Sequence, residues 1–168
     1  MPQQSSAYGT SDRPVIVVGV DGSASSLGAL HWALAESDRC DATVRAAFVF
    51  PCHEPTATLE GMSATDLSDE LSIVQLAGDE LARAIRRSVG EPAAQRVVTV
   101  VIPAESTPKG LAQAAVKAQL LVVGTGRGRG SIGQAEHGAI AGLSDVHCPV
   151  VVVPSAEPAA FAAGVGSD

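Results

Sequence analysis

The chain alternates between short apolar runs and longer segments with helical periodicity. The apolar runs are continuous and rich in β-branched residues, a pattern typical of strands buried on both faces of a parallel sheet. The predicted strands are residues 14–20, 42–50, 95–103, 119–124 and 149–154. Strands separated in this way by helical segments predict an α/β fold.

The intervening segments carry apolar residues three and four positions apart, which predicts amphipathic helices. The predicted elements are helices at 23–37, 66–88, 105–118 and around 137–145, and a long loop at 51–65. In the first helix, Leu27, Leu30 and Leu34 share one face. Gly90 suits the end of the second helix, and Pro108 suits the first turn of the third.

This order of elements predicts a five-stranded, parallel, doubly wound sheet with helices on both faces. Ligands of such sheets bind outside the carboxyl ends of the strands, where the strand order reverses. Two loops with suitable chemistry leave strand ends, at residues 20–23 and 124–138. We expect one domain over residues 13–154, flanked by flexible tails at 1–12 and 155–168.

Composition narrows the classes of function. The 168 residues are 46% hydrophobic and 17% charged, which fits a globular domain. The net charge is −7 and the 11 Lys and Arg residues are scattered, which argues against nucleic-acid binding. With neither a membrane-spanning run nor a signal-peptide pattern, we expect no membrane contact and a cytoplasmic location. Cys40, Cys52 and Cys148 form no CxxC pair, so neither a disulfide framework nor a zinc site is predicted.

Residues 122–142 are rich in glycine and follow a predicted strand. Glycine lets successive backbone N–H groups approach an anion, and the following helix would add its positive dipole end. Arg127 and Arg129 could neutralise phosphate charge. The alternative is a solvated glycine hinge without a ligand.

Two common phosphate sites do not fit this stretch. No Gly-Lys-Ser/Thr sequence follows the glycines, which excludes a P-loop. Residues 128–133 fit GxGxxG, but no acidic residue ends the next strand to hold a ribose, which argues against dinucleotide binding.

Three segments resemble the universal stress protein family. They are GVDGSASSLGALHWAL at 19–34, LLVVGTGRGRG at 120–130 and HCPVVVVP at 147–154, in the same order of elements. The resemblance covers residues 14–154. It implies the five-stranded fold of adenine-nucleotide alpha hydrolase-like proteins, a homodimer and, in one large branch, ATP binding through Gly-x2-Gly-x9-Gly-Ser/Thr.

The glycine motif matches in part. Gly128 and Gly138 have the required nine residues between them, but Thr125 stands where the first glycine is expected, directly after Gly124. Ala139 replaces the final hydroxyl residue, at a cost to phosphate binding of about 0.5–1.5 kcal/mol.

The resemblance therefore implies an adenine-nucleotide site, with ATP, with or without Mg²⁺, as the expected ligand. The implied site residues are Val20, Asp21, Val49, Gly124, Thr125, Arg127, Gly128, Gly130, Gly138, Ala139 and Ile140. Asp21 would border adenine and ribose, or alternatively only cap a helix. Val49 would line the adenine pocket, although alone it indicates a core position.

No nucleophile with a base partner can be identified, so we expect a nucleotide-binding stress regulator rather than an enzyme, with slow ATP hydrolysis at most. The adjacent ligand-type residues at 52–54 point in different directions, and no metal site is expected. The strand at 149–154 would pair across a two-fold axis in a homodimer. The alternatives are an interaction module of the same fold without nucleotide, and a related α/β hydrolase or nucleotidyl transferase.

Overall fold

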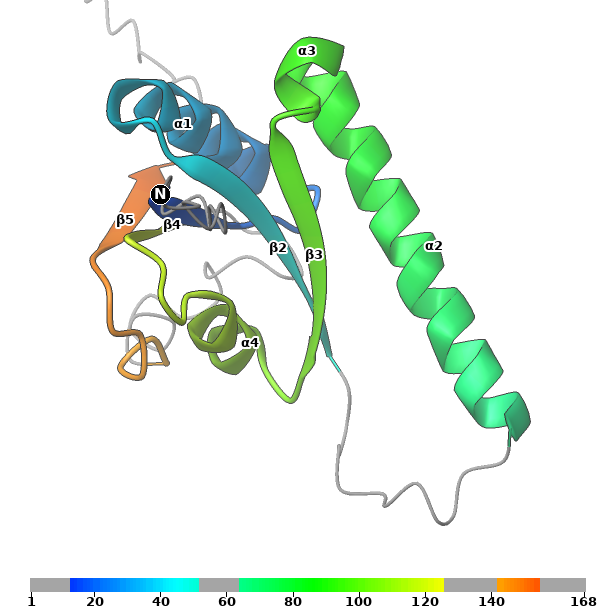
Figure 1. Ribbon diagram of the computed structural model, residues 1–168. Helices are drawn as coiled ribbons and strands as arrows, with labels where there is room; N and C mark the ends of the chain where they lie inside the picture. Colours follow the sequence, from blue (N-terminus) through cyan, green and yellow to red (C-terminus); the bar gives the residue numbers. More distant parts are fainter. Residues whose placement is uncertain (1–12, 52–63, 126–141, 155–168) are drawn as a thin grey trace, which may run out of the picture.

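The computed structural model describes residues 13–51, 64–125 and 142–154. Its centre is a five-stranded parallel sheet with the strand order β3-β2-β1-β4-β5 (Figure 1). The strands are β1 (Val15–Gly19), β2 (Thr43–Pro51), β3 (Val97–Ala104), β4 (Leu120–Thr125) and β5 (Val150–Pro154). The predicted fold class is confirmed. The strand order reverses between β1 and β4, so their carboxyl ends flank the crevice in which such sheets bind ligands.

Helices cover both faces of the sheet. The described helices are α1 (Ala24–Cys40), α2 (Ala64–Val89), α3 (Glu91–Ala94) and α4 (Thr107–Ala114). On one face, Ile16 and Val18 of β1 pack under α1 and α2. On the other face, Val17 packs with residues of α4 and with Leu143. Because both faces are buried, β1 is apolar at every position and shows no polar alternation.

Helix α1 lies over the centre of the sheet. Its buried residues are Ser25, Ser26, Ala29, Leu30, Ala33, Leu34 and Ser37. Leu27 lies at the edge of this face and is partly buried. Trp32, the single tryptophan of the chain, lies on α1 and is 37% exposed.

The second and third predicted helices differ from the observed ones at their ends. Gly90 adopts φ +80° and ends α2, as predicted, but the chain then forms the additional turn α3. Helix α4 ends at Ala114 rather than at 118, and Lys117 adopts a left-handed conformation with φ 64°. A left-handed residue interrupts helical hydrogen bonding, which explains the earlier end.

The predicted short helix around 137–145 is wrong in its described part. Residues 142–145 form a turn, in which Val146 N–H donates to the Leu143 carbonyl at 3.0 Å. Residues 137–141 lie outside the described part of the chain, as do the predicted tails at 1–12 and 155–168. Within the described ranges, no helix has the length and apolar character needed to cross a bilayer.

Candidate functional site

The candidate site lies at the carboxyl ends of β1 and β4. The chain leaves β1 through Val20, whose N–H donates to the Ala47 carbonyl at 2.9 Å and so extends the pairing with β2 by one residue. The Val20 side chain is 3% exposed and belongs to the core under α1. The structure therefore brings the backbone of Val20, and not its side chain, to the crevice.

Asp21 anchors the turn between β1 and α1. Its Oδ1 accepts hydrogen bonds from the Ser23 N–H at 2.9 Å and from the Ser23 hydroxyl at 2.5 Å. Gly22, with φ +82°, provides the left-handed conformation that lets the chain fold back over this carboxylate. The side chain of Asp21 is thus held by neighbours that the same short turn supplies.

The residue that caps α1 is Ser23. Its hydroxyl oxygen accepts from the Ser26 N–H at 3.3 Å, while the Ser26 hydroxyl donates to the Ser23 carbonyl at 3.0 Å. The Asp21 N–H donates in turn to the Ser26 hydroxyl oxygen at 3.2 Å. The alternative in which Asp21 itself caps the helix is therefore wrong. Asp21 orients the capping residue Ser23, and this role of Asp21 is the part that sequence reasoning missed.

Asp21 carries a fixed negative charge. Partial burial raises the pKa of its carboxyl, but hydrogen bonds from the Ser23 and Ser26 hydroxyls and from backbone N–H groups outweigh burial, and the net pKa lies below the ordinary 3.8. The group is therefore ionised at neutral pH. An ionised carboxylate only accepts hydrogen bonds, so it suits a hydroxyl or amine donor and repels phosphate.

Gly124 brings the end of β4 against the first turn of α1. A Cβ atom at this position would overlap the Ser25 carbonyl oxygen and would lie 3.0 Å from the Ser26 nitrogen. No side chain fits there, because both atoms belong to the backbone of a buried helical turn. Ser25 and Ser26 therefore lie between the two sides of the site. They are hydrogen-bonded to the turn that contains Asp21, and their backbone contacts Gly124. The sequence predicted a glycine loop here but not this contact.

Thr125 follows at the edge of the crevice. It is exposed, its hydroxyl donates to the Val153 carbonyl at 3.4 Å, and its backbone lies in register with Pro154 of β5. The start of the glycine-rich stretch is therefore attached to α1 on one side and to β5 on the other.

The side chain of Val49, near the end of β2, lies in the core. Its side chain is 9% exposed and packs on the α4 face of the sheet. A Cβ atom at Gly110 of α4 would lie 2.5 Å from Val49 Cγ1, so this helix approaches β2 closely only because residue 110 is glycine. Val49 is thus a core residue, as its apolar position alone indicates, and its role in lining an adenine pocket stays a prediction.

The comparison with known families agrees with this architecture. The sequence model of the Universal stress protein family matches residues 13–154. The chain belongs to the universal stress protein family.

Solved structures share the fold of this universal stress protein. The hypothetical protein MJ0577 has a TM-score of 0.59 at 11% identity, over 84% of this chain and 95% of its own. A universal stress protein family member from Burkholderia pseudomallei has a TM-score of 0.51 at 24% identity, over 83% and 95%. A universal stress protein in complex with cAMP has a TM-score of 0.49 at 21% identity, over 85% and 98%. Among curated proteins, none matches the chain.

The remaining residues of the predicted site lie outside the described part of this universal stress protein. They are Arg127, Gly128, Gly130, Gly138, Ala139 and Ile140. Their roles stay predictions. The structure brings together Asp21, Gly124 and the backbone of Val20 around the first turn of α1.

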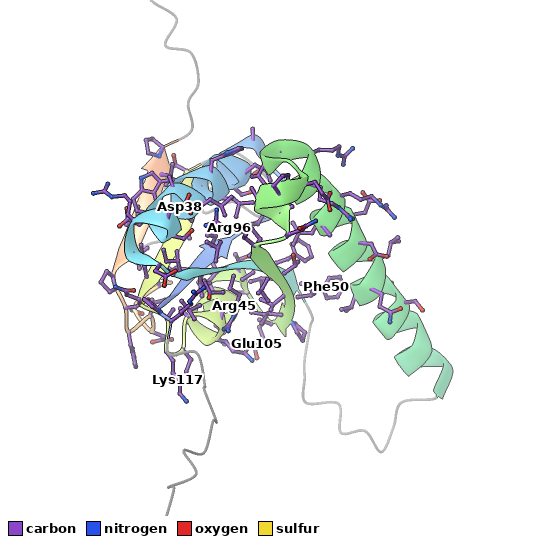
Figure 2. The ribbon with its side chains drawn as sticks, turned by 45° about the horizontal axis from the view of Figure 1, so that its top comes forward. Asp38, Arg45, Phe50, Arg96, Glu105 and Lys117 are labelled. Carbon is purple, nitrogen blue, oxygen red and sulfur yellow. The ribbon has the colours of Figure 1, made fainter. Side chains whose placement is uncertain are left out.

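Other reactive groups in the described residues lie away from this crevice. Burial raises the pKa of the Cys148 thiol above its ordinary 9.0, so the thiol stays protonated at neutral pH and is a poor nucleophile. No three His, Cys, Asp or Glu side chains of the described ranges gather into a metal site. A polar pocket of about 330 Å³ lies at the amino ends of the strands, beside the Asp38–Arg96 ion pair (Figure 2). The pocket thus lies at the opposite ends of the strands from the crevice.

Proposed function

We propose that this universal stress protein binds an adenine nucleotide at the carboxyl ends of β1 and β4 and acts as a stress regulator. The observation that carries the proposal is the contact of Gly124 with Ser25, since it holds the start of the glycine-rich stretch against the N-terminus of α1. The α1 N-terminus itself is capped by Ser23 beside the Asp21 carboxylate, so the groups that favour an anion are the backbone N–H groups of the glycine-rich stretch. Membership in the universal stress protein family supports the same ligand class.

The two sides of the crevice have different roles in this proposal. Asp21 is ionised and accepts a hydrogen bond from a ribose hydroxyl. Its charge directs the phosphates away from β1, toward the stretch that begins at Gly124. There, backbone N–H groups around Gly128 and Gly138 hold the phosphates, and Arg127 neutralises part of their charge. ATP, with or without Mg²⁺, is the ligand that uses all of these groups.

The proposed activity is binding rather than catalysis. The hydroxyl of Ser23 donates to Asp21, but the same oxygen accepts from the Ser26 N–H to cap α1, so it is engaged in structure. We propose that nucleotide binding changes how the protein contacts a partner, and that hydrolysis is slow.

The homodimer belongs to the same proposal. β5 pairs with β4 on one side, and among the described strands it has no neighbour on the other side. Val152 of β5 is 41% exposed. An apolar strand with an open edge is stabilised by pairing with another chain, and a second β5 across a two-fold axis provides this partner.

Thermal unfolding with and without ATP tests the ligand. With ATP at about 100 times its Kd, the midpoint should rise by roughly 5–10 °C. The variant Asp21→Asn, which keeps an acceptor oxygen but no charge, should bind ATP more weakly. Arg127→Gln should weaken the binding of ATP more than the binding of adenosine, because it removes only a phosphate contact.

Adenosine and inorganic triphosphate serve as controls for the two sides of the crevice. If the midpoint of thermal unfolding rises with triphosphate as much as with ATP, and not with adenosine, the site binds anions without recognising adenine. No rise with any nucleotide at millimolar concentration would reject the proposal, and would favour the interaction module in which Ala139 has replaced the phosphate-binding hydroxyl.

A further inference from the structure

Helix α2 exposes two large apolar side chains on the part that leads away from the sheet. Among its residues 72–89, the buried ones are Leu81 and Ile85. Ile73 and Leu76, one turn apart, are 52% and 61% exposed. Both figures show the first turns of α2 running out past the body of the domain (Figures 1 and 2). Isolated exposed apolar residues are common, but these two lie one turn apart on the same face of the helix.

The charges of α2 are divided between its two halves. In residues 64–80 the charged residues are Asp66, Asp69, Glu70, Asp79 and Glu80, and all are acidic. In residues 81–89 they are Arg83, Arg86 and Arg87, and all are basic. The helix dipole favours this arrangement at the two helix ends. It does not explain the apolar pair between them.

We propose that this face of α2 binds the α2 helix of a second copy of the chain in antiparallel orientation. An antiparallel pair places the acidic half of each helix beside the basic half of the other, whereas a parallel pair would place like charges together. The copies are thus electrostatically complementary in one orientation. This complementarity identifies a second copy, rather than an unrelated partner, as the occupant.

The register of the pair follows from the same residues. Ile73, Leu76, Glu80 and Arg83 are spaced three and four apart and so share one face of the helix. A two-fold axis near Leu76 gathers Ile73 and Leu76 of both copies into one apolar cluster. The same axis directs Arg83 toward the acidic first half of the partner helix. Arg83 now pairs with Glu80, but this ion pair is exposed and exchanges readily.

This contact is separate from the proposed pairing of β5. β5 and β3 are the opposite edges of the sheet, and α2 packs beside β3. A chain that uses both contacts forms higher assemblies than a dimer. Two helices bury little area, so we expect the α2 contact to be weak and dependent on protein concentration.

A single-cysteine cross-link tests the two-fold axis directly. In a full chain with Cys40, Cys52 and Cys148 replaced by alanine, Leu76→Cys should form a disulfide-linked dimer under mild oxidation. The matched control is Val116→Cys, since Val116 is 64% exposed beside α4. A cross-link at residue 76 well above the control supports the proposal. Equal or absent cross-linking overturns it.

Sedimentation over a range of protein concentrations tests the contact without introduced cysteines. Leu76→Glu should weaken one association step by more than about tenfold and leave any β5 dimer intact. Arg83→Glu should weaken the same step, and Arg83→Glu combined with Asp69→Lys should restore it, because an axis at residue 76 places residue 83 opposite residue 69 of the partner helix. Unchanged masses in all variants would overturn the proposal. A lower melting temperature of Leu76→Glu with unchanged mass would also overturn it, because this face would then be covered by its own chain.

Discussion

Helices α1 and α2 cover the same face of the sheet, but they are held in different ways. α1 buries residues in every turn from Ser25 to Ser37, and hydrogen bonds of Ser23 and Asp21 fix its start. In residues 72–89 of α2, burial is limited to Leu81 and Ile85 in the second half. Within residues 72–89, α2 is thus less buried than α1. α1 contacts four strands of the sheet, whereas α2 lies beside β3 at its edge, so α1 buries more of its surface.

Truncation of one leucine in each helix should show the largest difference between α1 and α2 in the free energy of unfolding. Leu30 is fully buried, so Leu30→Ala should lower the free energy of unfolding by about 2–5 kcal/mol. Leu76→Ala should change it by less than about 0.5 kcal/mol at high dilution, since an exposed side chain loses little on truncation. Urea denaturation measures both. Similar losses for the two variants would contradict the difference described between the helices.

Gly124, which contacts the first turn of α1 from β4, and Gly28, which lies inside α1, should respond to alanine in opposite directions. Gly124→Ala forces a methyl group against the Ser25 carbonyl, and we expect a loss of about 1–3 kcal/mol in the free energy of unfolding. Gly28 lies inside α1, where an added methyl group would meet no other part of the described chain within 4 Å, so Gly28→Ala should gain up to about 1 kcal/mol. Chemical denaturation gives both values. A neutral Gly124→Ala would mean that the end of β4 can move away from α1.

The smallest effect concerns acid stability. The pKa of Asp21 is lower in the folded chain than its ordinary 3.8, so its ionised form stabilises the fold above that pH. This contribution is lost as the pH falls through the folded pKa, since the proton must displace the Ser23 hydrogen bonds. Asp21→Asn should therefore flatten the decline in unfolding free energy below about pH 4.

Ser23→Ala serves as the control for this measurement, since it removes a donor but keeps the carboxylate. It should reduce the same decline. An unchanged acid profile in both variants would show that the turn does not hold the carboxylate.

The sequence alone predicted the strands and the first two helices well, because their patterns reflect burial by the sheet. The run at 14–20 is apolar throughout since both faces of β1 are covered, and Gly90 ended α2 as expected. The end of α4 was missed because it depends on the left-handed Lys117, and nothing in the helix-favouring residues 111–116 before it signals this conformation.

The site was less predictable for a similar reason. Asp21 and Gly124 lie about a hundred positions apart, and only the parallel pairing of β1 with β4 brings them to one helical turn. The serine cap follows a local signal, since the residues Asp21-Gly22-Ser23 after the first apolar run offer N-cap oxygens. The close approach at Gly124 leaves no local signal, because a glycine in a glycine-rich stretch looks the same whether or not it touches a helix.

Trp32 gives α1 an optical property that α2 lacks. It is the single tryptophan of the chain, and residues 64–89 contain no aromatic residue. It lies two turns after Ser25, about 10 Å along the helix axis from the crevice. Its partial exposure leaves its emission sensitive to the surrounding solvent. Tryptophan fluorescence therefore reports on the helix whose first turn borders the proposed nucleotide site.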